Sequence, residues 1–533
     1  MELHYSTIFE AHADRLRGRL AIKQGDTRRS WADFEARAAR FAAALLAHGV
    51  KQGSRIGQLL YNSPELLETY HGSLKIRSVP FNINYRYTAE EVLYILNDAE
   101  AEALVFHSSL SGVVAAVLPH APSIRLAVSV DDGGGRLDGA VDMLELLQAH
   151  PPARRIGRSP DDPVMIYTGG TTGMPKGVVA PLGPQLRQIV QRTPDLAALK
   201  APADPADLMP LAETLHEQGR QFIGLPLPPM VHGAALNIIG LPALVRGGTV
   251  VLPVQRHFDP AEAWDLVQNE RVTSMVIVGD AFARPLLTEL ERGQSRDIST
   301  LRTISSAGAV FSADVKAGLL AHMRADAAIY EYISATEGAM GVSVSTRDHS
   351  VETGRFMPHP GVILVDEQNR PLASDSGQSG RIAVPSVAHG YLKDDQKTAA
   401  TFPVIDGQRY AVPGDYAVML PDGSFRLLGR GSTCINTGGL KVFPDEVEEV
   451  LKSIPAVRDA IVIGIPDERF GQTVAALVAL VSGAQTSVEE IVASTRQRLA
   501  GFKAPRIVRL VEDIPRNNVG KPDYPAVRQI LGR

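Results

Sequence analysis

Apolar positions along the chain follow two spacings, one typical of helices and one typical of strands. From Trp31 to Leu45 they recur every three or four residues, and Gly49 follows. This pattern predicts an amphipathic helix that stops at a glycine. Short β-rich runs alternate with such helical patterns at residues 103–106, 163–167, 248–252 and 274–278. The alternation predicts an α/β fold in which helices flank the sheets.

Two stretches depart from this pattern. Residues 194–217 are rich in proline, aspartate and alanine, which predicts a surface excursion within a large domain. The residue pattern changes near residue 430, where residues 427–433 form a connection of mainly small residues. We therefore expect a large N-terminal α/β domain at 1–430, a boundary at 431–433 and a small α+β domain at 434–533.

The elements of the C-terminal part can also be predicted. Pro444 opens a helix, with Asp445 and Glu446 in the first turn, where the helix dipole favours acids. Strands are expected at 460–465 and 474–481 and a helix at 488–499. These elements make a compact unit of about one hundred residues, within the usual size of a domain.

Composition narrows the class of protein. The chain has 533 residues, 44% of them hydrophobic, and a formal net charge of −5, which predicts several soluble units and no nucleic-acid partner. Its one cysteine, Cys434, excludes a disulfide within the chain and a cysteine-based zinc site. The first residues do not read as a signal peptide and no apolar stretch is long enough to cross a bilayer, so we expect a cytoplasmic protein.

The strongest local signal is the glycine-rich stretch from Tyr167 to Gly177, which follows an apolar strand. Its four glycines let backbone N–H groups approach an anion, and threonine hydroxyls and Lys176 add donors. It is not a Walker A loop, because glycine follows the lysine in place of Ser or Thr. We interpret it as a polyphosphate loop; the alternative is a flexible glycine-rich turn.

The loop resembles the signature of the adenylate-forming, AMP-binding superfamily, which contains acyl-CoA synthetases, luciferases and peptide-synthetase adenylation domains. Further segments resemble the family's motifs in the family's order, through nearly the whole chain, at residues 229–233, 305–309, 330–338, 390–392, 413–415, 429–430, 437–439 and 515–521. The resemblance implies an acyl-CoA ligase, which converts a carboxylic acid through an acyl-AMP to its CoA thioester. ATP, Mg²⁺ and CoA are the cofactors that it implies. It also implies that the large domain at 1–430 has several subdomains, and that residues 431–433 are a hinge about which a small mobile lid domain at 434–533 rotates.

The resemblance also assigns catalytic roles. Glu337 would hold Mg²⁺, and Thr336 would donate to the α-phosphate. Asp415 would accept both ribose hydroxyls, and Arg430 would place a cationic fork near the ribose and phosphate. Lys521 would stabilise the charge that builds on the carboxylate and the α-phosphate during adenylation.

The remaining implied residues bind the three substrates. The nucleotide would contact Thr168, Gly169, Gly170, Thr171, Thr172, Gly173, Lys176, Gly308, Ala309, Ile333 and Ser334. The acyl group would contact Met230, His232 and Ala235. The thiol arm of CoA would pass Gly438 and Gly439. The apolar neighbours of His232 predict a bulky hydrophobic acid, and a homodimer is a further expectation.

Three positions depart from the commonest family pattern. Gly169 stands where Ser is frequent, and Thr433 stands where the hinge often has Asp or Lys. Ile333 stands where an aromatic ring usually stacks on adenine, a contact worth roughly 1–3 kcal/mol, and Tyr332 is one place off. The last departure raises an alternative function, in which the enzyme mainly converts a preformed acyl-adenylate to a thioester.

Two rival functions would place the chain in different classes of protein. An adenylation domain that loads a carrier protein would usually have an acidic residue near the acyl pocket, and none lies between Pro229 and Ile239. A non-enzymatic nucleotide sensor would be a decayed enzyme. The intact Glu337, Asp415, Arg430 and Lys521 argue against decay.

Overall fold

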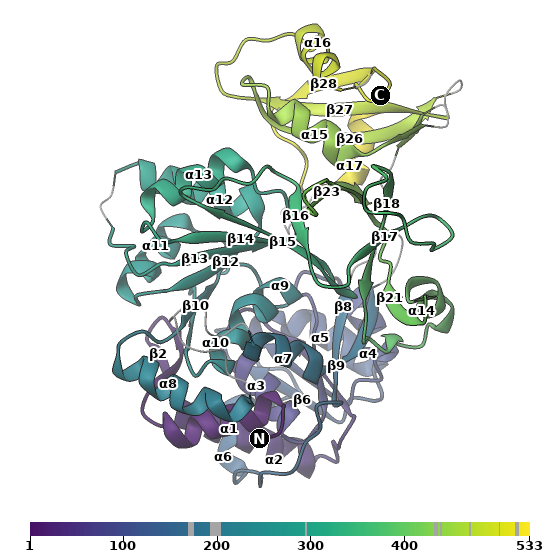
Figure 1. Ribbon diagram of the computed structural model, residues 1–533. Helices are drawn as coiled ribbons and strands as arrows, with labels where there is room; N and C mark the ends of the chain where they lie inside the picture. Colours follow the sequence, from purple (N-terminus) through teal and green to yellow (C-terminus); the bar gives the residue numbers. More distant parts are fainter. Residues whose placement is uncertain are drawn as a thin grey trace. The chain divides into compact units, whose positions relative to one another are not determined.

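The computed structural model describes residues 1–168, 175–191, 204–293, 296–430, 435–437, 440–467, 471–499, 501–516 and 522–532. Outside these ranges lie the predictions for Gly169, Gly170, Thr171, Thr172, Gly173, the hinge at 431–433, Gly438, Gly439 and Lys521. The chain divides into two compact units (Figure 1). Unit 1 comprises Met1–Glu337, Val344–Ser350 and Ser386–Ala400. Unit 2 comprises Gly338–Ser343, Val351–Pro385 and Thr401–Arg533.

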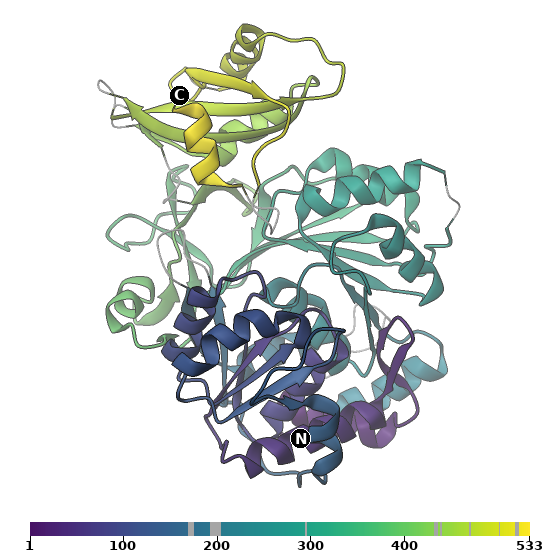
Figure 2. The same ribbon diagram turned by 180° about the vertical axis from the view of Figure 1, so that it is seen from behind.

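The main sheet of unit 1 is almost entirely parallel. Its strands lie in the order β2-β1-β11-β10-β12-β13-β14, and only β2 runs antiparallel to its neighbour. The bounds are β1 Leu20–Gln24, β2 Thr27–Ser30, β10 Ile223–Pro226, β11 Thr249–Leu252, β12 Ser274–Ile277, β13 Thr303–Ala307 and β14 Ala328–Ala335. Helices α11 Pro260–Asn269, α12 Gly279–Glu291 and α13 Ala313–His322 share a core with β12 to β14 (Figures 1 and 2).

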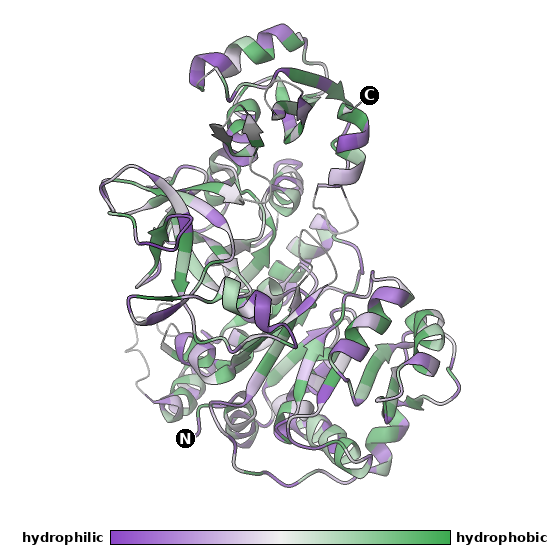
Figure 3. Cartoon of the chain, turned by 90° about the vertical axis from the view of Figure 1, so that its right-hand side faces the viewer, coloured by the Kyte–Doolittle hydropathy of each residue, from purple (hydrophilic) through white to green (hydrophobic). Residues whose placement is uncertain are grey.

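A second parallel sheet of unit 1 has the order β4-β3-β5-β6-β7. Its strands are β3 Arg55–Leu59, β4 Val79–Asn82, β5 Ala103–His107, β6 Leu126–Val130 and β7 Val141–Asp142. The predicted amphipathic helix is α2, Trp31–Ala47, and a capping box between Ser30 and Asp33 fixes its start. Figure 3 shows hydrophilic and hydrophobic residues side by side along such helices. A third, antiparallel sheet joins β8 Pro163–Thr168, β9 Lys176–Pro181 and β19 Gly390–Tyr391.

One sequence prediction is wrong for the residues that the structure describes. Composition predicts a surface excursion at 194–217, but the second half of this segment forms helix α8, Leu208–Glu217. The side chains of Leu208, Met209 and Ala212 belong to the main hydrophobic core. The proline-rich composition concealed apolar residues at helical spacing, and burial of that stripe decided the structure.

Unit 2 contains two sheets. In the first, β16 Arg355–Pro358, β23 Phe425–Arg430, β22 Asp415–Met419 and β18 Ser379–Pro385 are consecutive neighbours. The second contains β26 Val457–Asp467, β27 Gly471–Leu480 and β28 Ile507–Val511, with helices α15 Pro444–Lys452 and α16 Val488–Arg498. The C-terminal helices and strands predicted from the sequence are confirmed, and so is the α/β fold class. Among the described residues, no helix combines the length and apolar character that a membrane crossing needs.

A buried ion-pair network ties three helices of unit 1 together. Lys75, on α3 Pro64–Lys75, is 1% exposed and lies 2.5 Å from carboxylate oxygens of both Glu10 and Glu35. Arg158 contacts Glu10 at 2.7 Å, and His71 donates to Glu35 at 2.7 Å. Burial opposes ionisation of Glu35, but the hydrogen bonds and charges of His71 and Lys75 outweigh it and lower its pKa to about 2.

We expect Lys75→Met to destabilise unit 1 by about 3–5 kcal/mol, because it removes a buried cation that Glu10 and Glu35 share. Urea denaturation, monitored by tryptophan fluorescence, measures the free energy of unfolding. Both tryptophans, Trp31 and Trp264, are buried in unit 1 and report on it. The control is Lys51→Met at an exposed lysine, where a change within about 0.5 kcal/mol is expected. Equal effects of the two substitutions would show that the network contributes little.

Candidate active site

The carboxyl edge of the main parallel sheet brings two predicted nucleotide segments together. Strand β13 pairs with β14 so that Ala307 stands opposite Tyr332. Gly308 and Ala309, both exposed, therefore leave the sheet beside Ile333. Gly308 has a φ of +87°, a conformation that favours glycine and turns the chain at the edge. Ligands of open α/β sheets bind at this edge, so the adenine segments have a suitable position.

The alternation of side chains along β14 determines what Tyr332 can do. Tyr330 and Tyr332 lie on one face, with ring centroids 6.3 Å apart and ring planes 12° apart. Glu331 faces the other way, where it is buried and contacts Lys316 at 3.1 Å. Because faces alternate along a strand, Ile333 shares the side of Glu331 and not that of Tyr332. Tyr332 therefore does not replace the aromatic ring that position 333 lacks.

The ends of the phosphate loop are fixed by a β-hairpin. Thr168, the last residue of β8, pairs with Lys176, the first residue of β9, so the loop predicted from the sequence connects two paired positions. Before the loop, the hydroxyl of the buried Tyr167 donates to Asp98 at 2.6 Å. Burial and this hydrogen bond raise the pKa of Tyr167, so the hydroxyl stays a donor. The strand that leads into the loop is thus anchored to α4, Ala89–Asp98.

Lys176, the cation predicted to bind phosphate, forms an ion pair with Asp394. The backbone N–H of Lys397 also donates to Asp394, at 2.9 Å. The hydrogen bond between the two side chains raises the pKa of Lys176 and lowers that of Asp394, so both groups are charged. A lysine that already has an anionic neighbour can exchange it for a phosphate oxygen, which is also an anion.

Glu337, the predicted metal ligand, accepts a hydrogen bond from the hydroxyl of Tyr391. Tyr391 lies in β19 and pairs with Val178 of β9. The small antiparallel sheet therefore connects the phosphate hairpin to Glu337. The sequence motif at 390–392 gave Tyr391 no role, and Asp394 was not identified at all. An aromatic hydroxyl in a family motif was the available signal for Tyr391.

The acyl segment has an unusual helix. Residues Gly233–Ala235 form α9, and the π-helix Leu236–Gly240 follows, with the N–H of Leu241 bonded to the carbonyl of Leu236. Single π turns often occur at functional sites. Met230 and Ala235 are completely buried in the core, whereas His232 is exposed. The partly exposed apolar residues here are Ala234 and Ile238. The acyl-binding roles of Met230, His232 and Ala235 stay predictions.

In unit 2, the antiparallel pairing of β22 with β23 places Asp415 directly opposite Arg430. The Asp415 side chain is 7% exposed. The resemblance assigns these two residues to the ribose, and their strands make them cross-strand neighbours. For Arg430 and Thr168 the structure describes the backbone. Ser334 is exposed and Thr336 is partly buried in unit 1.

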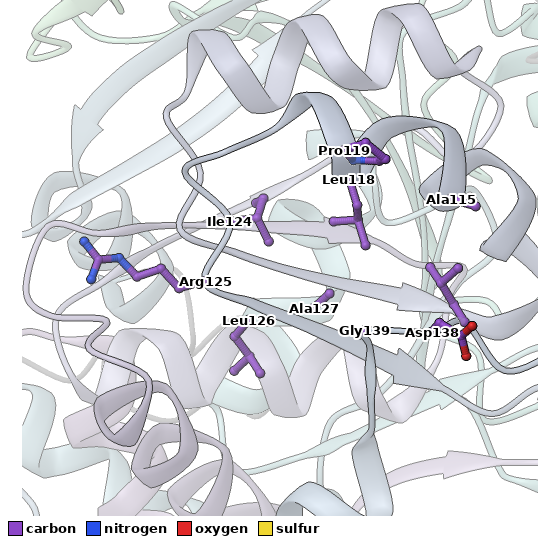
Figure 4. A pocket seen from close by; sticks show the side chains of 10 residues that line it. Ala115, Leu118, Pro119, Ile124, Arg125, Leu126, Ala127, Asp138 and Gly139 are labelled. Carbon is purple, nitrogen blue, oxygen red and sulfur yellow. The ribbon is translucent and has the colours of Figure 1, made fainter.

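A cavity of about 420 Å³ lies elsewhere in unit 1, between β6 and the loop before β7 (Figure 4). Apolar side chains such as Leu118, Ile124 and Leu137 line it, with Arg125 and Asp138 among them. None of the residues that line it belongs to a motif identified above. This cavity is therefore separate from the candidate active site.

Two family models match the chain. The model for AMP-binding enzymes matches residues 9–392, and the model for their C-terminal domain matches residues 446–521. Together they include the phosphate loop, Glu337 and most of the small C-terminal part. The two matches fall on the large N-terminal part and the small C-terminal part that the sequence predicts.

Relatives of similar length are CoA ligases or have the same fold. A medium/long-chain-fatty-acid–CoA/3-oxocholest-4-en-26-oate–CoA ligase from Mycolicibacterium smegmatis is 36% identical, over 98% of this chain and 96% of its own. A 3-oxocholest-4-en-26-oate–CoA ligase from Rhodococcus rhodochrous is 35% identical, over 98% and 95%. The anthranilate CoA ligase AuaEII with anthranoyl-AMP, 20% identical, has the same fold with a TM-score of 0.83, covering 99% of this chain and 97% of its own.

These findings do not favour a carrier-protein loader, a sensor or an enzyme restricted to thioester formation. The relatives are named for ligation of a carboxylic acid to CoA, and the AMP-binding family model agrees with the route through an acyl-AMP that the sequence resemblance implies. The chain belongs to the AMP-binding enzyme family and is an AMP-forming acid–CoA ligase.

Proposed function

We propose that the enzyme activates a bulky, mainly apolar acid, such as a medium- or long-chain fatty acid or the side-chain acid of a sterol. The observation that carries this proposal is the 36% and 35% identity to two relatives named for such acids. Ala234 and Ile238 offer apolar surface in the acyl segment, and no acidic residue there would attract an amino group. A mainly apolar pocket suits an acid of this class.

The nucleotide half of the site is proposed to hold ATP with Mg²⁺. Glu337 supplies a carboxylate oxygen, the type of ligand that Mg²⁺ combines with phosphate oxygens and waters. Among the residues that the structure describes, no cluster of three or more His, Cys, Asp or Glu could hold a metal. One carboxylate plus the phosphates of the substrate therefore fits better than a closed protein cage. When bound, the ion would neutralise phosphate charge, while the Tyr391 hydroxyl orients Glu337.

The remaining residues act on the ribose and phosphates. Asp415 would accept from the ribose hydroxyls, and Arg430 opposite it would add a cation. Thr336 would donate to the α-phosphate. Lys176 would leave Asp394 and bind a phosphate oxygen when ATP enters. The contacts of Thr336, Arg430 and Lys176 with phosphate would place donors or cations where negative charge increases in the transition state.

The C-terminal domain is proposed to serve both half-reactions. Lys521 would be delivered to the carboxylate for adenylation, and Gly438 and Gly439 would border the path of the CoA thiol for thioester formation. Rotation about the hinge predicted at 431–433 would exchange the two states. We propose that this happens in the cytoplasm, where ATP and CoA are available, and light scattering of the purified enzyme would test the expected homodimer.

A series of carboxylic acids tests the substrate class. We expect kcat/KM to rise from acetate through octanoate to palmitate or a sterol side-chain acid, because each buried methylene adds about 0.8 kcal/mol of favourable transfer energy until the pocket is filled. Release of AMP with each acid, at fixed ATP and CoA, is the measurement. A preference for acetate or for a charged amino acid over the larger hydrophobic acids would contradict the proposal.

Lys521→Ala is expected to abolish adenylation while it spares much of the thioester step. A cation is needed where charge builds on the carboxylate and α-phosphate, but not when the acyl-adenylate is already formed. Pyrophosphate exchange measures the first step, and chemically made acyl-adenylate with CoA measures the second. Lys503→Ala, at a lysine that contacts Glu446 at 2.6 Å, is the control for loss of a C-terminal lysine. Equal loss of both steps in Lys521→Ala would refute the assigned role.

Ile333→Tyr should tighten ATP binding by about one stacking contact, roughly 1–3 kcal/mol, because position 333 lies beside Gly308 and lacks a ring. Calorimetric titration of ATP into both forms gives the difference. Val310→Tyr, at an exposed residue of the neighbouring loop, controls for a nonspecific aromatic effect. If the unaltered enzyme already binds ATP tightly and exchanges pyrophosphate fast, the missing ring has no consequence.

A further inference from the structure

The segment that leads from β10 into the acyl helix is held by side chains from another sheet. Residues 227–230, within the described range 204–293, belong to no helix or strand. Pro228 and Pro229 have no N–H group, so this segment offers few donors for regular backbone pairing. Buried backbone groups still need partners. The N–H of Leu227 and the carbonyl of Pro229 have backbone partners, and two asparagines, Asn62 and Asn82, bind the carbonyl of Pro228 and both polar backbone groups of Met230.

Asn62 makes the larger set of contacts. It follows strand β3, and its Oδ1 accepts from the N–H of Met230 at 2.6 Å. Its Nδ2 donates to the carbonyl of Pro228 at 3.0 Å, with a longer contact of 3.4 Å to the carbonyl of Pro226. One amide therefore satisfies a donor and an acceptor on the same short segment. The side chain of Gln24 in turn holds the carbonyl of Asn62 at 2.9 Å.

Asn82 completes the set from the neighbouring strand. It is the last residue of β4, and its Nδ2 donates to the carbonyl of Met230 at 3.0 Å. Both polar backbone groups of Met230 are thus bound by asparagine side chains at the carboxyl ends of β3 and β4. These two strands are neighbours in the sheet, so the spacing of the two amides is set by the sheet.

Met230 packs against the π-helix of the acyl segment, so the position of Met230 affects that helix. Its side chain is completely buried, and its sulfur lies 3.3 Å from where a Cβ on Gly240 would stand. Gly240 is the last residue of the π-helix that carries Ile238 and Leu236. Interiors are close-packed, so a shift of Met230 displaces the turn that it touches.

We infer that Asn62 and Asn82 are positioning residues that set the place of the acyl segment and so determine which acids fit. The inference rests on the proposed function in one respect, namely that residues near 230–239 line the acyl site. Neither asparagine touches the acid itself in this scheme. Their removal should therefore change acid selectivity and leave the use of ATP almost unchanged.

The test uses the full-length enzyme with Asn62→Leu, Asn82→Leu and the double variant, since leucine keeps the approximate volume and removes both amide groups. The control is Asn97→Leu: Asn97 is exposed, and its amide donates to the carbonyl of His120 at 3.3 Å, in the same unit. For each variant, KM for the best acid, KM for ATP and the ratio of kcat/KM between octanoate and palmitate are measured, together with the melting temperature.

Each single variant should raise KM for the acid and shift the octanoate-to-palmitate ratio by about five- to tenfold, the effect of losing one or two hydrogen bonds. KM for ATP should stay within about twofold. The double variant should shift the ratio less than the product of the single shifts, because both asparagines hold the same residue. The control should change neither ratio nor KM.

Three results would overturn the inference. One is an unchanged acid ratio in both single variants. Another is a parallel rise of KM for acid and for ATP, which indicates a general structural loss. The third is a fall in melting temperature with selectivity unchanged in the folded enzyme. A wild-type enzyme that rejects hydrophobic acids would instead contradict the proposed function, and this measurement is separate from the variants.

Discussion

The carboxyl ends of parallel strands lie at one edge of their sheet, and this constraint organises the nucleotide half of the site. The pairing of Ala307 with Tyr332 places the turn at Gly308 next to Ile333. The same constraint in the second sheet places Asn62 and Asn82 together, because they follow or end adjacent strands. Residues far apart in the sequence become neighbours because backbone hydrogen bonds fix where strands stop.

Charge in the phosphate region is balanced before any ligand arrives. Lys176 pairs with Asp394, and Glu337 accepts from Tyr391, so the predicted cation and the predicted metal ligand each have a polar partner. The Lys176–Asp394 pair is partly exposed, and exposed ion pairs contribute little to stability. Lys176 can therefore exchange Asp394 for a phosphate oxygen at small cost. A deeply buried pair such as Lys75 with Glu10 could not be exchanged in this way.

Local patterns predicted local structure well and long-range partners poorly. The helix that begins at Trp31 and the strand at Ala103 follow from spacing alone, because burial of one face decides them. The roles of Asp394 and Asn62 could not be predicted. Each is an ordinary polar residue in sequence, and its partner lies more than 150 residues away. Helix α8 was missed because the proline-rich composition of the segment 194–217 outweighed the periodicity of the apolar residues in the helix.

The acyl segment shows why such long-range polar contacts arise. Pro228 and Pro229 prevent residues 227–229 from continuing strand β10, and the π-turn after them departs from ordinary helical pairing. A segment of this kind is free to take a shape suited to a ligand, but its backbone groups would be unsatisfied in the core. Side-chain amides satisfy these backbone groups, since one amide can donate and accept at once. Irregular backbone at a binding site thus requires regular structure nearby to hold those amides in place.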